Sequence, residues 1–132
     1  RGRLLVCVPQ SVVFHVGGAT LKKESPRKTF LNFRNNLVML YKNLPPDDLA
    51  SVMRVRAVLD YVAVLSFILK GQFSNALAVL RARRAYASLR ASFVESRKEN
   101  MKKTCLSVIP ERTKNSILAQ FYLHGKKFFS QL

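Results

Sequence analysis

One of the two histidines, followed closely by two glycines, is the first feature of this sequence that could support chemistry. His15 ends a short apolar segment, and Gly17 and Gly18 follow one residue later. An imidazole can bind a metal ion, and glycines let a ligand or another backbone approach closely. Arg34 and Asn35 then stand on a predicted helix. A histidine, two glycines and nearby cations together predict one wall of a metal-diphosphate site.

Each of these residues also has a structural interpretation. A lone histidine is more often packed in a core than bound to a metal, and Gly17 and Gly18 fit an ordinary turn equally well. Arg34 shares its helix face with Leu31 and Val38. We therefore expect its guanidinium group to be partly buried and to need an anion or a carbonyl group as its partner.

Basic residues follow the histidine loop and continue into the first turn of the predicted helix. The cations that could contact a diphosphate or an acceptor phosphate are Lys22, Lys23, Arg27 and Lys28. A solvated surface cluster is the alternative interpretation. Asn35 is either a substrate contact or a hydrogen-bonding residue that fixes the histidine loop.

The overall charge indicates an anionic partner. The 132 residues include 23 Lys and Arg against 7 Asp and Glu, which gives a net charge of +16. Nucleic acid, a membrane surface and a sugar diphosphate are all compatible with this charge. A hydrophobic content of 48% argues against a disordered basic tail, because that much apolar surface can offset the entropy cost of folding.

Several features expected of a complete enzyme are missing. The chain begins Arg1-Gly2-Arg3 without an initiator methionine, and it contains no glycine-rich phosphate loop and no convincing pair of catalytic carboxylates. We therefore expect a piece of a longer protein that is inactive alone and holds no catalytic residue. Cys7 and Cys105 are far apart and lack metal-ligand spacing, which favours reduced thiols and a cytoplasmic location.

The sequence predicts a mainly α fold with a short N-terminal β-hairpin. Two apolar, valine-rich segments, Leu4–Val8 and Val12–Val16, are predicted strands, and Pro9-Gln10-Ser11 is the predicted turn between them. Both strands are expected to be buried in a larger sheet. The longest apolar run, Tyr61–Leu69, is too short to span a bilayer, which takes about 20 residues.

Helical periodicity accounts for most of the remaining chain. The predicted helices cover about Pro26–Leu44, Asp47–Lys70, Ser74 or Asn75 to Lys98, and Lys114–Leu123. Ser25 is the predicted N-cap of the first helix, with Pro26 as its first residue, and Gly71 is expected to end the second. Arg56 and Asp60 lie four residues apart on the second helix and are expected to form a structural ion pair.

Three motifs in this order resemble the C-terminal part of bacterial family 2 glycosyltransferases. They are Val12–Leu21, which contains the histidine and the glycines, then Ser25–Lys28, and then Asn32–Leu37 with Tyr41–Asn43. The resemblance covers roughly residues 1–70 well and the next dozen residues more loosely. On this basis residues 1–24 are the end of a catalytic domain, residues 25–100 a helical C-terminal region and residues 101–132 a basic helical tail.

The resemblance implies a GT-A fold whose nucleotide-sugar site, acidic metal motif and catalytic carboxylate precede residue 1. In that family an aspartate deprotonates an acceptor hydroxyl, which displaces the nucleotide diphosphate with inversion while a divalent cation neutralises the leaving group. His15 matches the late histidine of the family, a ligand of that Mn²⁺ or Mg²⁺ ion in several members. Arg34 and Asn35 match its Arg-Asn helix motif beside the active site.

The resemblance also implies the substrates, which are a nucleotide-sugar donor and a glycan or lipid-linked acceptor used in polysaccharide biosynthesis. The basic helices need a separate explanation, because a sugar-nucleotide site uses only a few cations. They could dock at the anionic inner face of the cell membrane, cover the catalytic domain or form a homodimer contact. A nucleic-acid-binding module without catalysis is a further alternative, disfavoured because no recognised nucleic-acid-binding motif is present.

Overall fold

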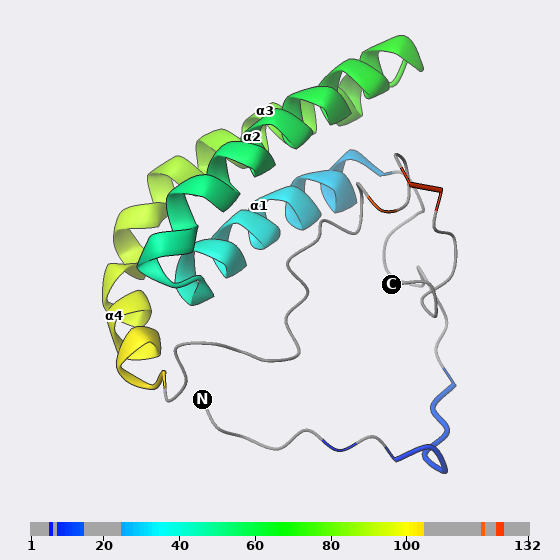
Figure 1. The fold of residues 1–132 in the computed structure, drawn as a ribbon. Coiled ribbons are helices and arrows are strands. Elements are labelled where there is room, and N and C mark those ends of the chain that lie inside the picture. The colour runs from blue at the N-terminus through cyan, green and yellow to red at the C-terminus, as the bar shows by residue number, and fades with distance from the viewer. Residues whose placement is uncertain (1–5, 7, 15–24, 105–119, 121–123, 126–132) are drawn as a thin grey trace. The chain divides into compact units, whose positions relative to one another are not determined.

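The computed structural model describes residue 6 and residues 8–14, 25–104, 120 and 124–125. The chain divides into two compact units, one of residues 3–104 and one of residues 1–2 and 105–132. The described residues of the first unit form four α-helices, α1 to α4, and one 3-10 turn, η1 (Figure 1). The prediction of a mainly α fold is therefore confirmed for the described residues.

The predicted β-hairpin is wrong where the structure describes it. Val6, Val8 and residues 12–14 are not in strands, and the side chains of Val13 and Phe14 are 81% and 97% exposed. The turn between them is present, since the N–H of Ser11 donates a hydrogen bond to the carbonyl oxygen of Val8 at 3.0 Å. A two-stranded hairpin is only marginally stable unless its apolar face packs on something, and these side chains pack on nothing described.

Helix α1 covers Pro26–Asn43 and begins as predicted. The Ser25 hydroxyl accepts a hydrogen bond from the N–H of Lys28 at 3.2 Å, and Pro26 occupies the first turn, where its missing N–H costs nothing. Leu37 and Tyr41 are the buried residues of the helix. They place one face of α1 in the core.

Helix α2 covers Pro46–Leu69, with Asp47 and Asp48 in its first turn. Gly71, with φ of +71°, ends it as predicted, because a residue with a Cβ rarely adopts that conformation. The Lys70–Gln72 connection leads directly into α3. Such a short connection makes α2 and α3 antiparallel neighbours.

Helix α3 covers Phe73–Leu89, followed by η1 at Arg90–Phe93 and α4 at Val94–Lys102. The predicted helix to Lys98 is therefore wrong in two respects. It starts at Phe73, before the predicted starting residues Ser74 and Asn75. Asn75 is instead a buried polar residue, and its side-chain oxygen accepts a hydrogen bond from the Thr29 hydroxyl at 2.9 Å. The 3-10 turn then interrupts it, and this separates α4 from α3.

The bundle is held together by α1 and α3, which run parallel. Thr29 and Asn75 join their starts, and the rings of Tyr41 and Tyr86 meet edge to face near their ends, with centroids 6.2 Å apart. The buried residues of α3 are mostly small: Asn75, Ala76, Ala78, Val79 and Ala82. At one end of the bundle α1 and α3 begin and α2 finishes. We call this the hairpin end, and we call the opposite end the α4 end.

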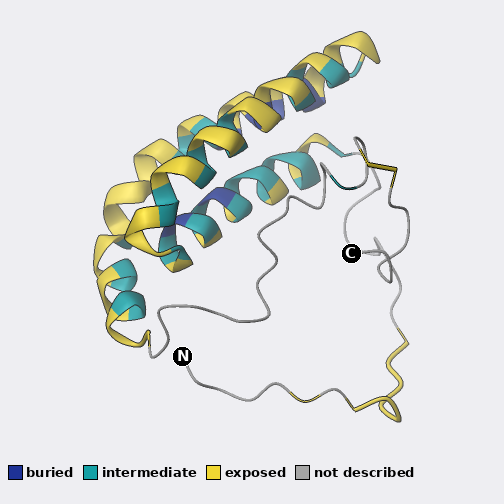
Figure 2. Ribbon diagram, in the orientation of Figure 1, coloured by how far each residue is buried: buried dark blue, intermediate teal, exposed yellow. Residues whose placement is uncertain are grey.

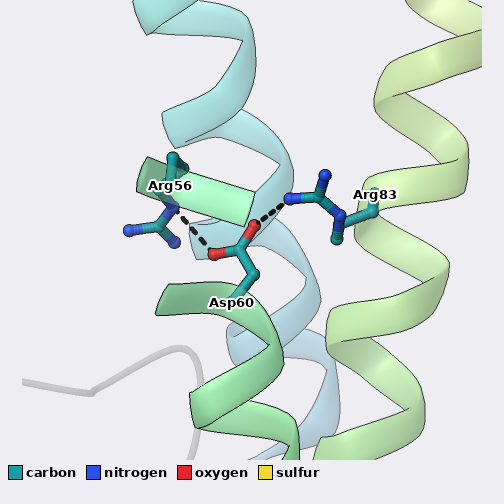
Figure 3. Close-up of polar contacts among 3 residues, drawn as sticks. All are labelled: Arg56, Asp60 and Arg83. Atoms are coloured by element: carbon teal, nitrogen blue, oxygen red, sulfur yellow. Dashed lines mark hydrogen bonds and ion pairs between the residues drawn. The ribbon is translucent and has the colours of Figure 1, made fainter. Parts of the chain in front are cut away.

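A buried carboxylate ties α2 to α3 (Figure 3). Asp60 is fully buried, and its two oxygens lie 2.8 Å from Nε of Arg56 and 2.6 Å from Nη1 of Arg83. The predicted Arg56–Asp60 pair is thus confirmed, and Arg83 is a second partner from the neighbouring helix. Each arginine also stacks on an aromatic ring, Arg56 on Phe33 and Arg83 on Tyr61.

Candidate anion-binding site

A groove opens between α1 and α3 at the hairpin end. Its volume is about 530 Å³, and its lining residues are Pro26, Arg27, Phe30, Ser74, Leu77, Ala78 and Arg81. The groove exists because the two helices run parallel, which brings their starts together. The N–H groups at a helix start carry partial positive charge, so both helices favour an anion at this end.

Two arginines from different helices line the groove. Arg27 comes from α1 and Arg81 from α3, and both side chains are exposed. Neither forms an ion pair with a carboxylate among residues 25–104. Phe30, Leu77 and Ala78 supply the apolar part of the lining. Two guanidinium groups beside an apolar surface suit a phosphate-bearing group attached to a less polar body.

Arg34 lies next to this groove and is held in place by its neighbour. Its Nε and Nη2 atoms donate hydrogen bonds of 3.1 and 2.9 Å to the side-chain oxygen of Asn35. Its guanidinium carbon lies 5.3 Å from the centre of the Phe30 ring. The expectation of a partly buried Arg34 with a carbonyl partner is therefore confirmed. The partner is the amide of the adjacent residue.

The structure brings together only part of the predicted site. Arg27, Arg34 and Asn35 lie on α1 around Phe30, and the half-buried Lys28 follows Arg27 in the first turn. The remaining candidates lie outside the described residues: His15, Gly17, Gly18, Lys22 and Lys23. Within the described parts of the chain, no group of three His, Cys, Asp or Glu side chains is placed to hold a metal ion.

Arg81 and Ser74 were not predicted as site residues. Arg81 is one of several arginines on a long basic helix, and nothing in its local sequence distinguishes it from Arg84. What distinguishes it is the parallel packing of α1 and α3, which brings Arg81 and Arg27 to the lining of one groove. That packing joins residues more than 50 positions apart, so local periodicity does not reveal it.

Comparison of the chain with protein-family models, with curated proteins and with solved structures finds no match. The resemblance to glycosyltransferases therefore depends on the motifs quoted from the sequence. Among the described helices, none is long and apolar enough to cross a bilayer.

Among the described residues, one tyrosine has a shifted pKa, and it lies in an aromatic cluster at the α4 end. Burial raises the pKa of the Tyr86 phenol above its ordinary value of 10.0, and the nearby Tyr41 raises it further, while Arg90, Arg97 and Arg83 lower it by less. Arg90 and Arg97 both lie over the Tyr41 ring, at 5.3 and 5.4 Å. The folded protein therefore favours the neutral phenol.

We expect this shift to make the folded protein less stable at high pH. A group with a raised pKa in the folded state contributes its full stability below the unfolded pKa and loses it as the pH rises through the folded value. Urea denaturation from about pH 8 to about pH 11 should therefore show a larger loss of stability for the wild type than for Tyr86→Phe. Equal losses in the two proteins would contradict the assignment.

Proposed function

We propose that this chain is part of an inverting glycosyltransferase and that the groove between α1 and α3 binds a phosphate-bearing group of its substrate. One observation carries the proposal. Arg27 and Arg34, which belong to the motifs that resemble family 2 glycosyltransferases, meet at Phe30, where Arg27 lines the groove and Arg34 stacks on the ring. Arg81 supplies a second cation from α3.

The roles of the residues before α1 are those that the resemblance implies. In the proposed GT-A enzyme, a sugar passes from a nucleotide-sugar donor to a glycan or lipid-linked acceptor, and the base that deprotonates the acceptor precedes this chain. His15 is the proposed ligand of a Mn²⁺ or Mg²⁺ ion, which neutralises the diphosphate. Gly17 and Gly18 admit the ligand closely, and Lys22 and Lys23 add cations beside it.

The α1 residues have a positioning role in this proposal. Because two donors of Arg34 bind one oxygen of Asn35, the plane of the guanidinium group is fixed, and its remaining N–H groups stay available to a phosphate oxygen. Arg27 and Arg81 then approach the same region from two helices. Cations held at fixed positions bind an anion at a lower entropy cost than mobile ones.

The groove is tested by pyrophosphate binding to the 132-residue chain, measured by calorimetry. We expect the double variant Arg27→Gln, Arg81→Gln to lose affinity for pyrophosphate by about tenfold or more, because charge-assisted hydrogen bonds are lost on both walls of the groove. Arg84→Gln is the matched control, since Arg84 is an exposed arginine of the same helix that does not line the groove. Equal weakening by the control would show nonspecific charge attraction only.

The reaction is tested with the full product of the gene that encodes this chain. Transfer of labelled sugar from a nucleotide donor should fall with the groove variant and remain with Arg84→Gln. A full product that transfers no sugar from any nucleotide donor would contradict the glycosyltransferase proposal, whatever the outcome for pyrophosphate binding.

A further inference from the structure

The hairpin end of the bundle carries a cluster of apolar side chains that nothing in the described parts of the chain covers. Leu69 is 79% exposed and Phe73 is 66% exposed, although both are large and apolar. Leu65, Ile68 and Leu77 extend this surface with exposures of 56%, 43% and 45%. We call these five residues the tip. The exposed apolar face of α2 continues beyond the tip with Val55, Val58 and Val62, which are 61%, 62% and 57% exposed. Exposed apolar patches of this kind mark surfaces that bind a partner or a membrane.

The tip results from the way α2 turns into α3. Leu69 is the last residue of α2 and Phe73 the first residue of α3, with only Lys70–Gln72 between them. In Figure 1 this corner lies at the end of the bundle farthest from α4. In Figure 2 most of the ribbon at this corner has the colour of exposed residues. The exposed fractions of Leu69 and Phe73 show that no described helix covers most of either side chain.

The described residues nearest the tip include cations and no carboxylate. Lys70 lies between the two helices and Arg27 is in the first turn of α1, whereas Arg81 is in the middle of α3, eight residues after Phe73. The carboxylates of residues 25–104 lie elsewhere. Asp47 and Asp48 start α2 at the opposite end, Glu95 and Glu99 are on α4, and Asp60 is buried between two arginines.

We propose that the tip docks the protein on an anionic lipid bilayer, with Leu69 and Phe73 entering the interfacial region and the surrounding cations contacting lipid headgroups. The chemistry matches on both counts, since apolar side chains gain by leaving water and each cation near an anionic membrane adds attraction. This inference does not depend on sugar transfer. It names a surface that shares only Leu77 with the groove, because neither Leu69 nor Phe73 lines the groove.

Other occupants fit the tip less well. A second copy of this chain, joined tip to tip about a two-fold axis, would bring Lys70 and the neighbouring arginines against their own copies. A nucleic acid would satisfy the cations but leave the exposed leucine and phenylalanine in water. An anionic bilayer satisfies both the charge and the apolar surface.

The test uses the absence of tryptophan from the sequence. Phe73→Trp introduces a single tryptophan at the tip, and Met39→Trp places one near the end of α1, at a side chain 53% exposed and away from the apolar face of α2. We expect vesicles of phosphatidylserine and phosphatidylcholine to blue-shift the emission of Trp at position 73 and to leave that at position 39 nearly unchanged. Vesicles of phosphatidylcholine alone should give a much smaller shift.

Affinity variants complete the test, with cosedimentation of the 132-residue chain as the measurement. Leu69→Ser with Phe73→Ser should lower partitioning into the anionic vesicles about tenfold or more, because two apolar side chains no longer leave water. Lys70→Gln should lower it about fivefold, as expected for the loss of one cation near the surface. Met39→Ser, at an exposed apolar position near the end of α1, is the matched control and should bind like the wild type.

Three outcomes would overturn the proposal. The first is equal binding to neutral and anionic vesicles, and the second is equal loss of binding with Met39→Ser. The third is a dimer in size-exclusion chromatography that the tip variants dissociate while vesicles bind neither form, which would make the tip a contact between copies. Circular dichroism of each variant establishes that the helices are retained, so a loss of binding reports on the tip itself.

Discussion

Replacing Asp60 with alanine is expected to lower the free energy of unfolding by about 3 kcal/mol, at the lower end of the range for breaking a buried ion pair. The carboxylate is fully buried and contacts two guanidinium groups, one on its own helix and one on α3. Its removal leaves two positive charges facing each other across a cavity. Because Arg56 and Arg83 keep 24% and 26% of their side-chain surface exposed, they can partly regain water, which limits the loss.

Urea denaturation followed by circular dichroism measures this loss, and two variants define its origin. Asp60→Asn keeps the size of the side chain and removes its charge, so we expect most of the destabilisation to remain. Glu95→Gln is the matched control, because Glu95 pairs with Lys98 on the surface, where both side chains are largely exposed. We expect no measurable effect there. If Asp60→Ala unfolds at the same urea concentration as Glu95→Gln, the carboxylate does not tie α2 to α3.

The Asp60 cluster also shows which parts of this fold follow from the sequence. Arg56 and Asp60 are four residues apart on one helix, so their pairing was predictable from helical geometry. Arg83 is 23 residues from Asp60, and it becomes a partner only after α2 folds back on α3. The same difference applies to the helix ends. Ser25 and Gly71 determine helix ends through backbone groups only a few residues away, and both were predicted correctly.

The errors share a physical cause. The valine-rich segments near the N-terminus have the composition of strands, but a strand also needs a partner and a packed face, which composition does not supply. The interruption of the long basic helix by η1 has no proline or glycine to signal it between Arg90 and Phe93. We attribute it to contacts that α4 makes with α1, since these require a change of direction after α3.

The candidate site also has features that follow from neighbouring residues and features that follow only from helix packing. Arg34 and Asn35 are adjacent in sequence and share a predictable helix face, so the half-buried guanidinium group and its need for a carbonyl partner could be expected. The groove itself could not, because it needs Arg81 and Ser74 from α3 beside Arg27 from α1. The tip likewise depends on how α2 turns into α3. Its apolar residues fit helical periodicity, and only the packed bundle shows that they remain exposed.

Arg97 is expected to be the residue that fixes α4 to α1. Its Nη1 atom donates hydrogen bonds to the carbonyl oxygens of Tyr41 and Leu44, the latter at 2.8 Å. Carbonyl groups in the last turn of a helix have no partner within that helix, and the positive charge complements the helix dipole there. Asn100 adds a bond of 3.2 Å to the carbonyl oxygen of Lys42. A cation from α4 therefore closes the C-terminal end of α1.

Arg97→Met should lower the free energy of unfolding by about 2 kcal/mol, because hydrogen bonds from a charged donor are lost while the apolar stem is kept. Arg90→Met is the matched control. Arg90 lies over the same Tyr41 ring but donates no hydrogen bond to the described residues of α1, so its loss should cost only about 0.5 kcal/mol. Urea denaturation gives both values, and hydrogen exchange at the amides of α4 should accelerate only with Arg97→Met. Equal effects of the two substitutions would mean that stacking on Tyr41, rather than hydrogen bonding to the end of α1, holds α4 in place.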